Sequence, residues 1–326
     1  MQGKLKLTDE IARRLCCPVC KSRLELADPD NFRCTNPACK AVFPIVDGIP
    51  ILINETASVF LIQDFVQRHN TYFKLIDPKQ ERSSPFLSKL KGLPQKILPE
   101  IGENVRAMQN YETFQQLLTT DNPRPAVLVL GGSAPGKGME SILKSSIQFT
   151  DTDISFGPRT ALICDAHDIP FEDQVFDGVI AQAVLEHVAD PYRCVAEIHR
   201  VLKRDGLVYA ETPFIQQVHG GKYDFTRFTH RGHRRLFRAF EEIKSGAVCG
   251  PGMALAWSWK FFLVSFATTR KGRFFLEAFA RLTSFWLKYF DDYLVDKPAT
   301  RDAASCFFFL GKKSDRLLSD RDLIRY

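Results

Sequence analysis

Apolar and polar positions divide the chain into three kinds of pattern. Near the N-terminus, short apolar stretches stand between cysteines. Residues 56–120 alternate apolar and polar positions at roughly helical spacing, with breaks near Pro78, Pro85 and Pro94. From residue 126 onward, short apolar runs separated by polar segments predict strands. The seven predicted strands are 126–130, 146–150, 160–164, 176–181, 206–212, 241–248 and 304–310.

Strands that alternate with helices predict an α/β fold. We expect a Rossmann-like, seven-stranded doubly wound sheet, with the last two strands added at one edge and ligands bound at the carboxyl ends of the strands. The helix before the fifth strand is well marked. Asp190 can cap it, Pro191 suits its first turn, Val195, Ile198, Val201 and Leu202 share one face, and Gly206 follows its end.

A helical insertion at 251–300 separates the sixth and seventh predicted strands. Its aromatic residues are Trp257, Trp259, Phe261, Phe262, Phe266, Phe274, Phe275, Phe279, Phe285, Trp286 and Phe290, and its interleaved basic residues include Lys260, Arg270, Lys271, Arg273, Arg281 and Lys288. The pattern fits amphipathic helices on a membrane surface, and it equally fits a helical cap packed over a pocket. Lys260 interrupts the most apolar stretch, so a membrane span is not expected.

These patterns predict four parts of the chain. They are a cysteine module at 1–55, a helical connector at 56–120, a main domain at 121–315 that carries the insertion, and a C-terminal tail at 316–326. The N-terminus lacks the apolar segment of a signal peptide, and four of the nine cysteines are scattered in the manner of reduced core residues. We therefore expect a cytoplasmic protein. Contact with the inner face of the membrane would follow if the insertion is an anchor.

The N-terminal cysteines have the spacing of a metal site. Cys17 and Cys20 form a C-x2-C pair, and Cys34 and Cys39 form a C-x4-C pair, which together supply the ligands of tetrahedral zinc. Cys16 is an alternative to Cys17, although Cys17 gives the tighter turn. The alternative for the whole set is buried free thiols.

The segment Leu15–Ile53 resembles the zinc-ribbon family of tRNA- and protein-methyltransferase activator subunits. The resemblance rests on a Leu-x-Cys-Pro-x-Cys beginning and a Phe-Pro-Ile-x-Asp-Gly-Ile-Pro-Ile-Leu ending, in which Asp47-Gly48 forms a hairpin turn. In that family the module supports a methyltransferase. The resemblance therefore implies a methyltransferase in the remainder of the chain.

A glycine-rich loop follows the first predicted strand of the main domain. The loop begins at Gly131 and Gly132, and small residues there let backbone amides approach a ligand closely. The same stretch nearly forms a phosphate-binding P-loop, but Gly138 stands where the P-loop requires Ser or Thr for magnesium. Asp153 lies about 20 residues further on, just past the second strand, where an acid can accept hydrogen bonds from both ribose hydroxyls.

The order of motifs over 126–245 resembles class I S-adenosylmethionine-dependent methyltransferases. The series runs from the glycine loop through Asp153 and Asp165-Ala166 to the segments 184–188 and 197–203. The resemblance implies that Gly131, Gly132, Ser133 and Gly136 line the methionine part, that Asp153 holds the ribose, that Asp165 and Ala166 contact adenine, and that Gln182 lies beside the sulfonium. Asp153 and Asp165 have an alternative as helix caps or turn residues.

Two features depart from the family pattern. Val129 stands where family members carry an acid, and Pro135 lies inside a loop that is longer than usual. Both departures bear on loop geometry and cofactor affinity. They motivate one alternative interpretation, in which the domain is a non-catalytic cofactor-binding scaffold.

The loop after the fifth strand is expected to cover the substrate pocket. The candidate general bases are His187, His219, Asp224 and His230, and His187 has an alternative as a packed helix residue. The predicted function is methylation of a small-molecule, glycan or lipid-linked acceptor. The enzyme alternative is an RNA or protein methyltransferase, suggested by the zinc ribbon and by the basic run 231–238. The net charge of +6 permits nucleic acid as a partner without favouring it.

Overall fold

The computed structural model describes residues 5–67 and 98–325. The strands are β1 (Leu24–Asp28), β2 (Asn31–Cys34), β3 (Val42–Val46), β4 (Ile49–Leu52), β5 (Ala126–Leu130), β6 (Gln148–Asp153), β7 (Leu162–Cys164), β8 (Phe176–Gln182), β9 (Leu202–Pro213), β10 (Phe240–Cys249) and β11 (Cys306–Lys313). The α-helices are α1 (Asp9–Ala12), α2 (Ile62–Val66), α4 (Ala107–Thr119), α5 (Pro191–Val201), α6 (His230–Leu236), α7 (Pro251–Val264), α8 (Arg270–Ser284), α9 (Asp291–Leu294) and α10 (Asp320–Arg325). Short 3-10 helices are η2 (Met139–Ser141), η3 (Ala166–Asp168), η4 (Gly221–Tyr223), η5 (Phe285–Phe290) and η6 (Pro298–Asp302).

The strands form a single mixed sheet. Its order is β1-β2-β3-β4-β7-β6-β5-β8-β9-β11-β10. All seven predicted strands are present as β5 to β11; β7, β6, β5, β8 and β9 are parallel, and β11 and β10 add at one edge in antiparallel orientation. This arrangement confirms the Rossmann-like α/β prediction. The predicted strand count was wrong, because the sheet has eleven strands in the described part of the chain.

The four extra strands come from the N-terminal module. Its last strand, β4, pairs in parallel with β7, joining Ile51 to Ile163 and Leu52 to Cys164. Every side chain of β4 is buried, as expected for a strand covered on both faces. The predicted Asp-Gly hairpin turn joins β3 to β4, and both Asp47 (φ 51°) and Gly48 (φ 76°) adopt the left-handed conformation that such a turn requires.

Helices cover both faces of the central sheet. On one face, α4 buries Tyr111 and Phe114 in the same apolar cluster as Val127 of β5. On the other face, α5 and α6 pack against the sheet, with Ile198 and Phe237 fully buried. The predicted start of α5 is confirmed: the Asp190 side chain accepts a hydrogen bond from the Arg193 N–H, and Pro191 occupies the first turn. The predicted end was wrong, because the helix stops at Val201 and Leu202 already begins β9, which pairs with β8.

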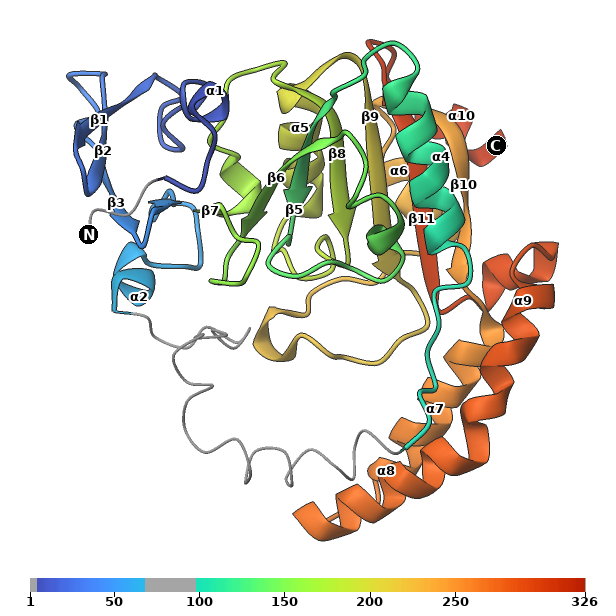
Figure 1. Cartoon of the computed structure of the whole chain (residues 1–326). Coiled ribbons are helices and arrows are strands. Elements are labelled where there is room, and N and C mark those ends of the chain that lie inside the picture. The colour runs from blue at the N-terminus through green and yellow to red at the C-terminus, as the bar shows by residue number, and fades with distance from the viewer. Residues whose placement is uncertain (1–4, 68–97, 326) are drawn as a thin grey trace.

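The predicted insertion consists of helices. α7 and α8 lie side by side and extend away from the central sheet, followed by η5 and α9 (Figure 1). No helix in residues 5–67 or 98–325 is long and apolar enough to cross a bilayer. Of the predicted connector, the structure describes α2 and α4; the breaks at Pro78, Pro85 and Pro94 lie outside the described residues.

Candidate active site

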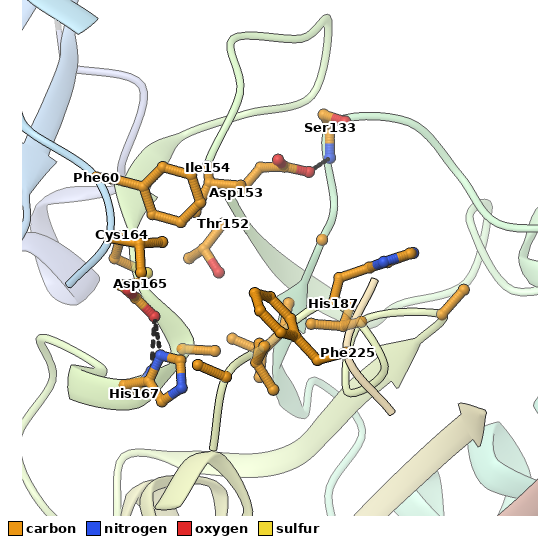
Figure 2. Close-up of a pocket in the computed structure, with 18 residues that line it drawn as sticks. Phe60, Ser133, Thr152, Asp153, Ile154, Cys164, Asp165, His167, His187 and Phe225 are labelled. Carbon is orange, nitrogen blue, oxygen red and sulfur yellow. Dashed lines mark hydrogen bonds and ion pairs between the residues drawn. The ribbon is translucent and has the colours of Figure 1, made fainter. Parts of the chain in front are cut away.

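A cavity lies at the carboxyl ends of the parallel strands, where the fold predicts a ligand site. It is surrounded by the glycine loop, the ends of β6 and β7, the segment after β8, and two residues of the connector (Figure 2). Its lining residues are Val59, Phe60, Leu130, Gly131, Ser133, Thr152, Asp153, Ile154, Cys164, Asp165, Ala166, His167, Ala183, Val184, His187, Val188, Ala189 and Phe225. The apolar walls and a few carboxylates give it the character of a site for a small organic ligand.

Asp153 joins the glycine loop to the end of β6. Its Oδ2 accepts a hydrogen bond of 2.9 Å from the backbone N–H of Ser133, and Figure 2 shows this contact at the rim of the cavity. Burial raises the pKa of Asp153 above its usual value, although the Ser133 N–H opposes that shift. A carboxylate at this point can accept hydrogen bonds from a diol, as the sequence predicts for the ribose.

Asp165 is held by three donors inside the protein. Its Oδ1 accepts hydrogen bonds from the backbone N–H of His167 at 3.0 Å and from Nδ1 of His167 at 2.6 Å, and its Oδ2 accepts one from Ser58 Oγ at 2.5 Å. Nε2 of His167 accepts from the Asp190 N–H, which assigns the proton to Nδ1. Burial alone would raise the pKa of Asp165, but the His167 and Ser58 contacts hold it below its usual value. Asp165 is therefore a rigid, ionised part of the wall, and it also caps η3.

The glycine loop depends on two of its predicted residues for steric reasons. Gly131 has φ 68°, and a Cβ there would lie 2.6 Å from Val184 Cγ2. A Cβ at Gly136 would collide with the carboxamide of Gln182. Gly131 lines the cavity together with Ser133, whereas Gly132, Gly136 and Gln182 do not.

Gln182 supports the glycine loop from behind the cavity. Its Nε2 donates to the Lys137 carbonyl at 3.0 Å and to Glu211 Oε2 at 2.9 Å, and its Oε1 accepts from the Tyr111 hydroxyl at 2.9 Å. These contacts position the loop relative to β8 and β9. In this structure Gln182 acts on the cavity through the loop.

The four predicted general bases occupy three different environments. His187 lines the cavity. The ring of His219 packs against the ring of His187, with the centroids 4.9 Å apart and the planes nearly perpendicular. Asp224 is instead bound by Arg227 and by the backbone N–H groups of His219 (2.7 Å) and Gly220 (3.2 Å). Although burial opposes it, the Arg227 pair and these N–H groups hold the pKa of Asp224 well below its usual range. The structure therefore places Asp224 as a tie within its loop.

His230 lies apart from the other three. It begins α6, its ring packs against Phe307 at 5.3 Å, and it lines a separate pocket with Arg231 and Arg301. Burial lowers the pKa of His230 below its usual value. The structure does not bring His230 to the cavity that holds Asp153 and His187.

Sequence reasoning did not assign a role to several residues of this region. Phe60 and Phe225 line the cavity from segments outside the motif series, on different sides of it (Figure 2). Glu186 lies next to His187 and is 1% exposed, yet none of the motifs singled it out. Its position beside a histidine just after β8 was the available signal, because charged residues there follow directly from the carboxyl end of a strand.

The four cysteines predicted as metal ligands converge. Cys17 Sγ lies 3.8 Å from Cys39 Sγ, Cys20 Sγ lies 3.4 Å from Cys34 Sγ, and all four sulfurs are within 4.8 Å of one another. Cys16 is buried outside this cluster, where its N–H donates to the Pro170 carbonyl of the main domain. A set of four sulfurs at these separations fits a tetrahedral soft-ligand site.

Comparison with known proteins places this cavity in a recognised kind of domain. Residues 131–210 match a family model described as a methyltransferase domain. The matched range begins at the glycine loop and ends in β9, so it contains the loop, Asp153, Asp165 and His187. It supports S-adenosylmethionine-dependent methyl transfer of the class I kind. The match begins after the N-terminal module, so the resemblance of Leu15–Ile53 to the activator family stays a prediction.

Solved structures with a similar fold are distant in sequence. The 1,6-didemethyltoxoflavin-N1-methyltransferase of Burkholderia thailandensis is 14% identical, with a TM-score of 0.38, and the match covers 90% of this chain and 99% of that one. Geranyl diphosphate C-methyltransferase of Streptomyces coelicolor A3(2) is 13% identical, with a TM-score of 0.40 and coverage of 63% and 75%. Phosphoethanolamine N-methyltransferase 2 of Haemonchus contortus is 15% identical, with a TM-score of 0.41 and coverage of 64% and 53%. No curated protein sequence is significantly similar to this chain.

Proposed function

We propose that this protein transfers the methyl group of S-adenosylmethionine to a small-molecule, glycan or lipid-linked acceptor. The observation that supports this proposal is the cavity at the carboxyl ends of β5 to β8, which lies within the matched methyltransferase range and is lined by the glycine loop and two carboxylates. The residues present fit the cofactor. Asp153 offers a carboxylate at the cavity rim, and Phe60 and Ile154 offer apolar surface beside it.

The proposed contacts follow the chemistry of each residue. Asp153 accepts hydrogen bonds from the ribose hydroxyls, Gly131 and Ser133 adjoin the methionine part, and Ala166 contacts adenine next to the rigid Asp165. The cofactor supplies an activated methyl group when it is bound. The protein then has to orient the acceptor and exclude water, and orientation supplies much of the rate enhancement in such a displacement.

His187 is the candidate base that faces the cavity. Its Nδ1 lies 3.0 Å from the Tyr223 carbonyl, which assigns the proton to Nδ1, and its Nε2 lies 3.7 Å from Oε1 of Glu186. Of the four predicted bases, His187 alone lines the cavity, with His219 behind it. We place the acceptor on this side of the site.

Calorimetry of cofactor binding tests the proposal. Asp153→Asn keeps an acceptor for the Ser133 N–H but removes the charge, so S-adenosylmethionine should bind about 1–2 kcal/mol more weakly. Asp205→Asn is the matched control, because Asp205 is an exposed acid that pairs with Lys312 outside the cavity. Equal affinity of wild type and Asp153→Asn, or no binding of S-adenosylmethionine by the folded wild type, would reject the proposal.

The insertion supports a membrane-linked acceptor. Its exposed side chains include Trp259, Phe262, Phe266, Phe274, Phe275, Phe279, Leu282, Trp286, Tyr289, Phe290 and Tyr293. Exposed basic residues Arg270, Lys271 and Arg273 stand at the start of α8, beside two of these aromatics. Dense aromatic surface next to basic charge is the composition of an interfacial anchor for anionic lipid. We therefore propose peripheral membrane contact through α7 and α8.

The RNA-methyltransferase alternative loses much of its basis. Of the basic run at 231–238, Arg231 donates to the Leu323 and Ile324 carbonyls, Arg235 pairs with Asp320, and Arg238 donates to the Leu318 carbonyl. These arginines hold the C-terminal segment against α6. The non-catalytic alternative is distinguished by turnover, since a scaffold binds the cofactor without producing S-adenosylhomocysteine from any acceptor.

We propose that the four cysteines hold zinc. The sulfur separations and the partial burial of the cluster support a structural site that leaves no ligand position open. The module also docks on the main domain through Lys21, whose Nζ donates to Glu197 Oε2 at 2.8 Å. In this arrangement the module braces the sheet edge next to the cofactor cavity.

A further inference from the structure

A buried carboxylate and two imidazoles meet beside the cofactor cavity. Nε2 of His187 and Nε2 of His219 each lie 3.7 Å from Oε1 of Glu186. The ligand atoms of the three residues all lie within 4.8 Å of one another. The loop itself is held by other contacts, which include the Asp224–Arg227 pair and the hydrogen bonds from the Phe225 and Thr226 N–H groups to the Glu186 carbonyl.

The Glu186 carboxylate has no ordinary hydrogen-bond partner. Its side chain is 1% exposed, and within residues 5–67 and 98–325 neither oxygen accepts a hydrogen bond. The two Nε2 atoms at 3.7 Å are too far away for one. Leaving a buried charge without donors costs free energy, so the carboxylate is expected to have a further partner between itself and the imidazoles.

Both imidazoles are oriented as metal ligands are. Nδ1 of His187 lies 3.0 Å from the Tyr223 carbonyl, and Nδ1 of His219 lies 3.3 Å from the Gln217 carbonyl. A carbonyl can only accept, so Nδ1 of His187 carries the proton and its Nε2 faces Glu186. At His219, the Gln217 carbonyl and Asp224 Oδ2 at 3.6 Å favour a proton on Nδ1, although Arg227 Nη2 approaches the same nitrogen at 3.5 Å. Histidine ligands commonly have the far ring nitrogen fixed in this way by a backbone carbonyl.

We infer that Glu186, His187 and His219 bind a divalent transition-metal cation. Metal–ligand bonds of about 2.1 Å put neighbouring ligand atoms about 3.0–3.5 Å apart, so each carboxylate–imidazole separation of 3.7 Å needs a shift of a few tenths of an ångström, and the two imidazoles offer ligand nitrogens within 4.8 Å of each other. Two imidazoles and one carboxylate suit Mn²⁺, Fe²⁺, Co²⁺ or Zn²⁺ better than Ca²⁺ or Mg²⁺, which prefer oxygen.

Because the site adjoins the part of the cavity where we place the methyl acceptor, we propose that the cation binds the acceptor. Three protein ligands leave at least one coordination position open, and His187 places that position next to the cavity. A hydroxyl bound there loses its proton more easily, because the cation stabilises the resulting oxyanion. This role of the cation rests on the proposed function. The cation then takes the place of His187 as the group that promotes loss of the proton, because Nε2 of His187 binds the cation.

The acceptor O–H bond breaks and its proton leaves to solvent. A lone pair of the metal-bound oxygen forms the new O–CH3 bond while the S–CH3 bond of the cofactor breaks, and the sulfur keeps the bonding pair as a neutral thioether. The cation is unchanged. The acceptor class is therefore one with a hydroxyl group.

Mn²⁺ titration followed by electron paramagnetic resonance tests the site directly. The free ion gives the signal, and Mn²⁺ has little affinity for thiolates, so the cysteine cluster does not interfere. Full-length protein, dialysed against a chelator with the cysteine zinc retained, should bind one Mn²⁺ per chain. His219→Ala and Glu186→Gln should each weaken this binding by about tenfold or more. His230→Ala is the matched control and should bind as wild type does.

Calorimetry with S-adenosylmethionine on the same samples separates this inference from the proposed function. Unchanged cofactor affinity in His219→Ala shows that the variant is folded, so a lost Mn²⁺ signal then belongs to the site. Wild-type protein that binds the cofactor but takes up no Mn²⁺ at millimolar concentration would overturn the inference while leaving the proposed function standing. Equal Mn²⁺ binding by wild type, His219→Ala and Glu186→Gln would also overturn it.

Discussion

The N-terminal module and the helical insertion are attached to opposite regions of the same sheet, and they treat their apolar residues in opposite ways. The module joins the sheet through β4 and buries Leu15, Phe32 and Phe43 almost completely. The insertion connects β10 to β11 and leaves Phe266 and Phe275 each 68% exposed. Both segments are too small to form a large core by themselves.

The difference lies in what closes each segment. Four sulfurs converge inside the module, and hydrogen bonds and ion pairs tie it to the main domain. Inside the insertion, the two carboxylate oxygens of Asp291 accept hydrogen bonds from the Gly252 and Met253 N–H groups at 2.7 and 2.9 Å, and an ion pair between Lys288 and Glu103 joins the insertion to the segment before α4. The convergence of the four cysteines goes with apolar residues that point inward. In the insertion, many of the aromatic side chains stay exposed.

Loss of one sulfur ligand should have the largest effect. Thiolate zinc sites contribute roughly 10 kcal/mol to the folding of small modules, so Cys34→Ala should release one zinc per chain and unfold β1 to β3. β4 should stay protected because it pairs with β7. Elemental analysis and amide hydrogen exchange measure both effects. Cys16→Ala is the control and should keep the zinc. If β1 to β3 stay protected from exchange in Cys34→Ala, the cysteine cluster is not what holds the N-terminal module together.

Removal of exposed aromatic side chains from the insertion should have the next largest effect, which is a loss of binding to vesicles. Phe262 and Phe266 are 57% and 68% exposed with ring centroids 5.3 Å apart, and burial of a large apolar side chain contributes about 1.5–3 kcal/mol. Phe262→Ser/Phe266→Ser should therefore weaken flotation with anionic vesicles by more than tenfold, and salt should weaken the wild type. Leu26→Ser/Val42→Ser, two exposed apolar residues of the module, should float as wild type. Wild-type protein that never floats would mean that the insertion is a packed cap.

The packing of α9 against the first turn of α7 can be weakened at a single carboxylate. Asp291 is 1% exposed, and its removal leaves two buried N–H groups without an acceptor, which costs about 1–3 kcal/mol. Asp291→Ala should speed hydrogen exchange in the first turn of α7 and in η5 while the central sheet keeps its protection. The adjacent, exposed Asp292 provides the control variant Asp292→Ala, for which exchange should be unchanged. Uniform loss of protection over the whole chain would show that the insertion is not a separate unit.

Glu211 on β9, in the central sheet between the two segments, should give a smaller, pH-dependent effect on stability. Burial raises the pKa of Glu211 on β9 from 4.5 to about 7, although Tyr209, Gln182 and Asn104 donate hydrogen bonds that oppose the shift. Between these two pKa values the folded protein binds more protons than the unfolded chain. Stability should therefore be present at low pH and be lost as the pH rises through about 7. Glu211→Gln should remove this part of the dependence.

Thermal unfolding measures this effect. The Tm difference between about pH 5 and about pH 8 should shrink by a few degrees in Glu211→Gln relative to wild type. Glu241→Gln, on the exposed surface of β10, should change nothing. An unaltered Tm difference in Glu211→Gln would show that the carboxyl is ionised throughout.

Much of the fold could be predicted because its signals are local. The seven strands of the main domain, the Asp190 cap and the Asp47-Gly48 turn all depend on residues a few positions apart. The joining of β4 to β7 could not be predicted in this way. Ile51 and Ile163 are more than a hundred positions apart, and an apolar strand does not specify which edge it pairs with.

The residues of the candidate site also differ in whether local sequence signals could predict them. Residues within the motif series, such as Asp153, Asp165 and His187, were recognised from their order and do line the cavity. His230 was grouped with them because it lies in the same loop region, but the chain carries it into a separate pocket beside Phe307. Phe60 belongs to the connector and lines the cavity of the main domain. Hydrophobic periodicity within the connector does not indicate which other part of the chain such a residue contacts.

The element types, most turns and caps, the grouping of four cysteines, and the succession of strands along the main domain could be read from the amino-acid sequence alone. These depend on backbone preferences and on side chains that are close along the chain. Only the tertiary structure decided that the module extends the main sheet, that Gln182 holds the glycine loop, and that His219 faces Glu186 and His187. Each of these outcomes depends on long-range packing, in which many side chains together select one partner among several that local chemistry allows.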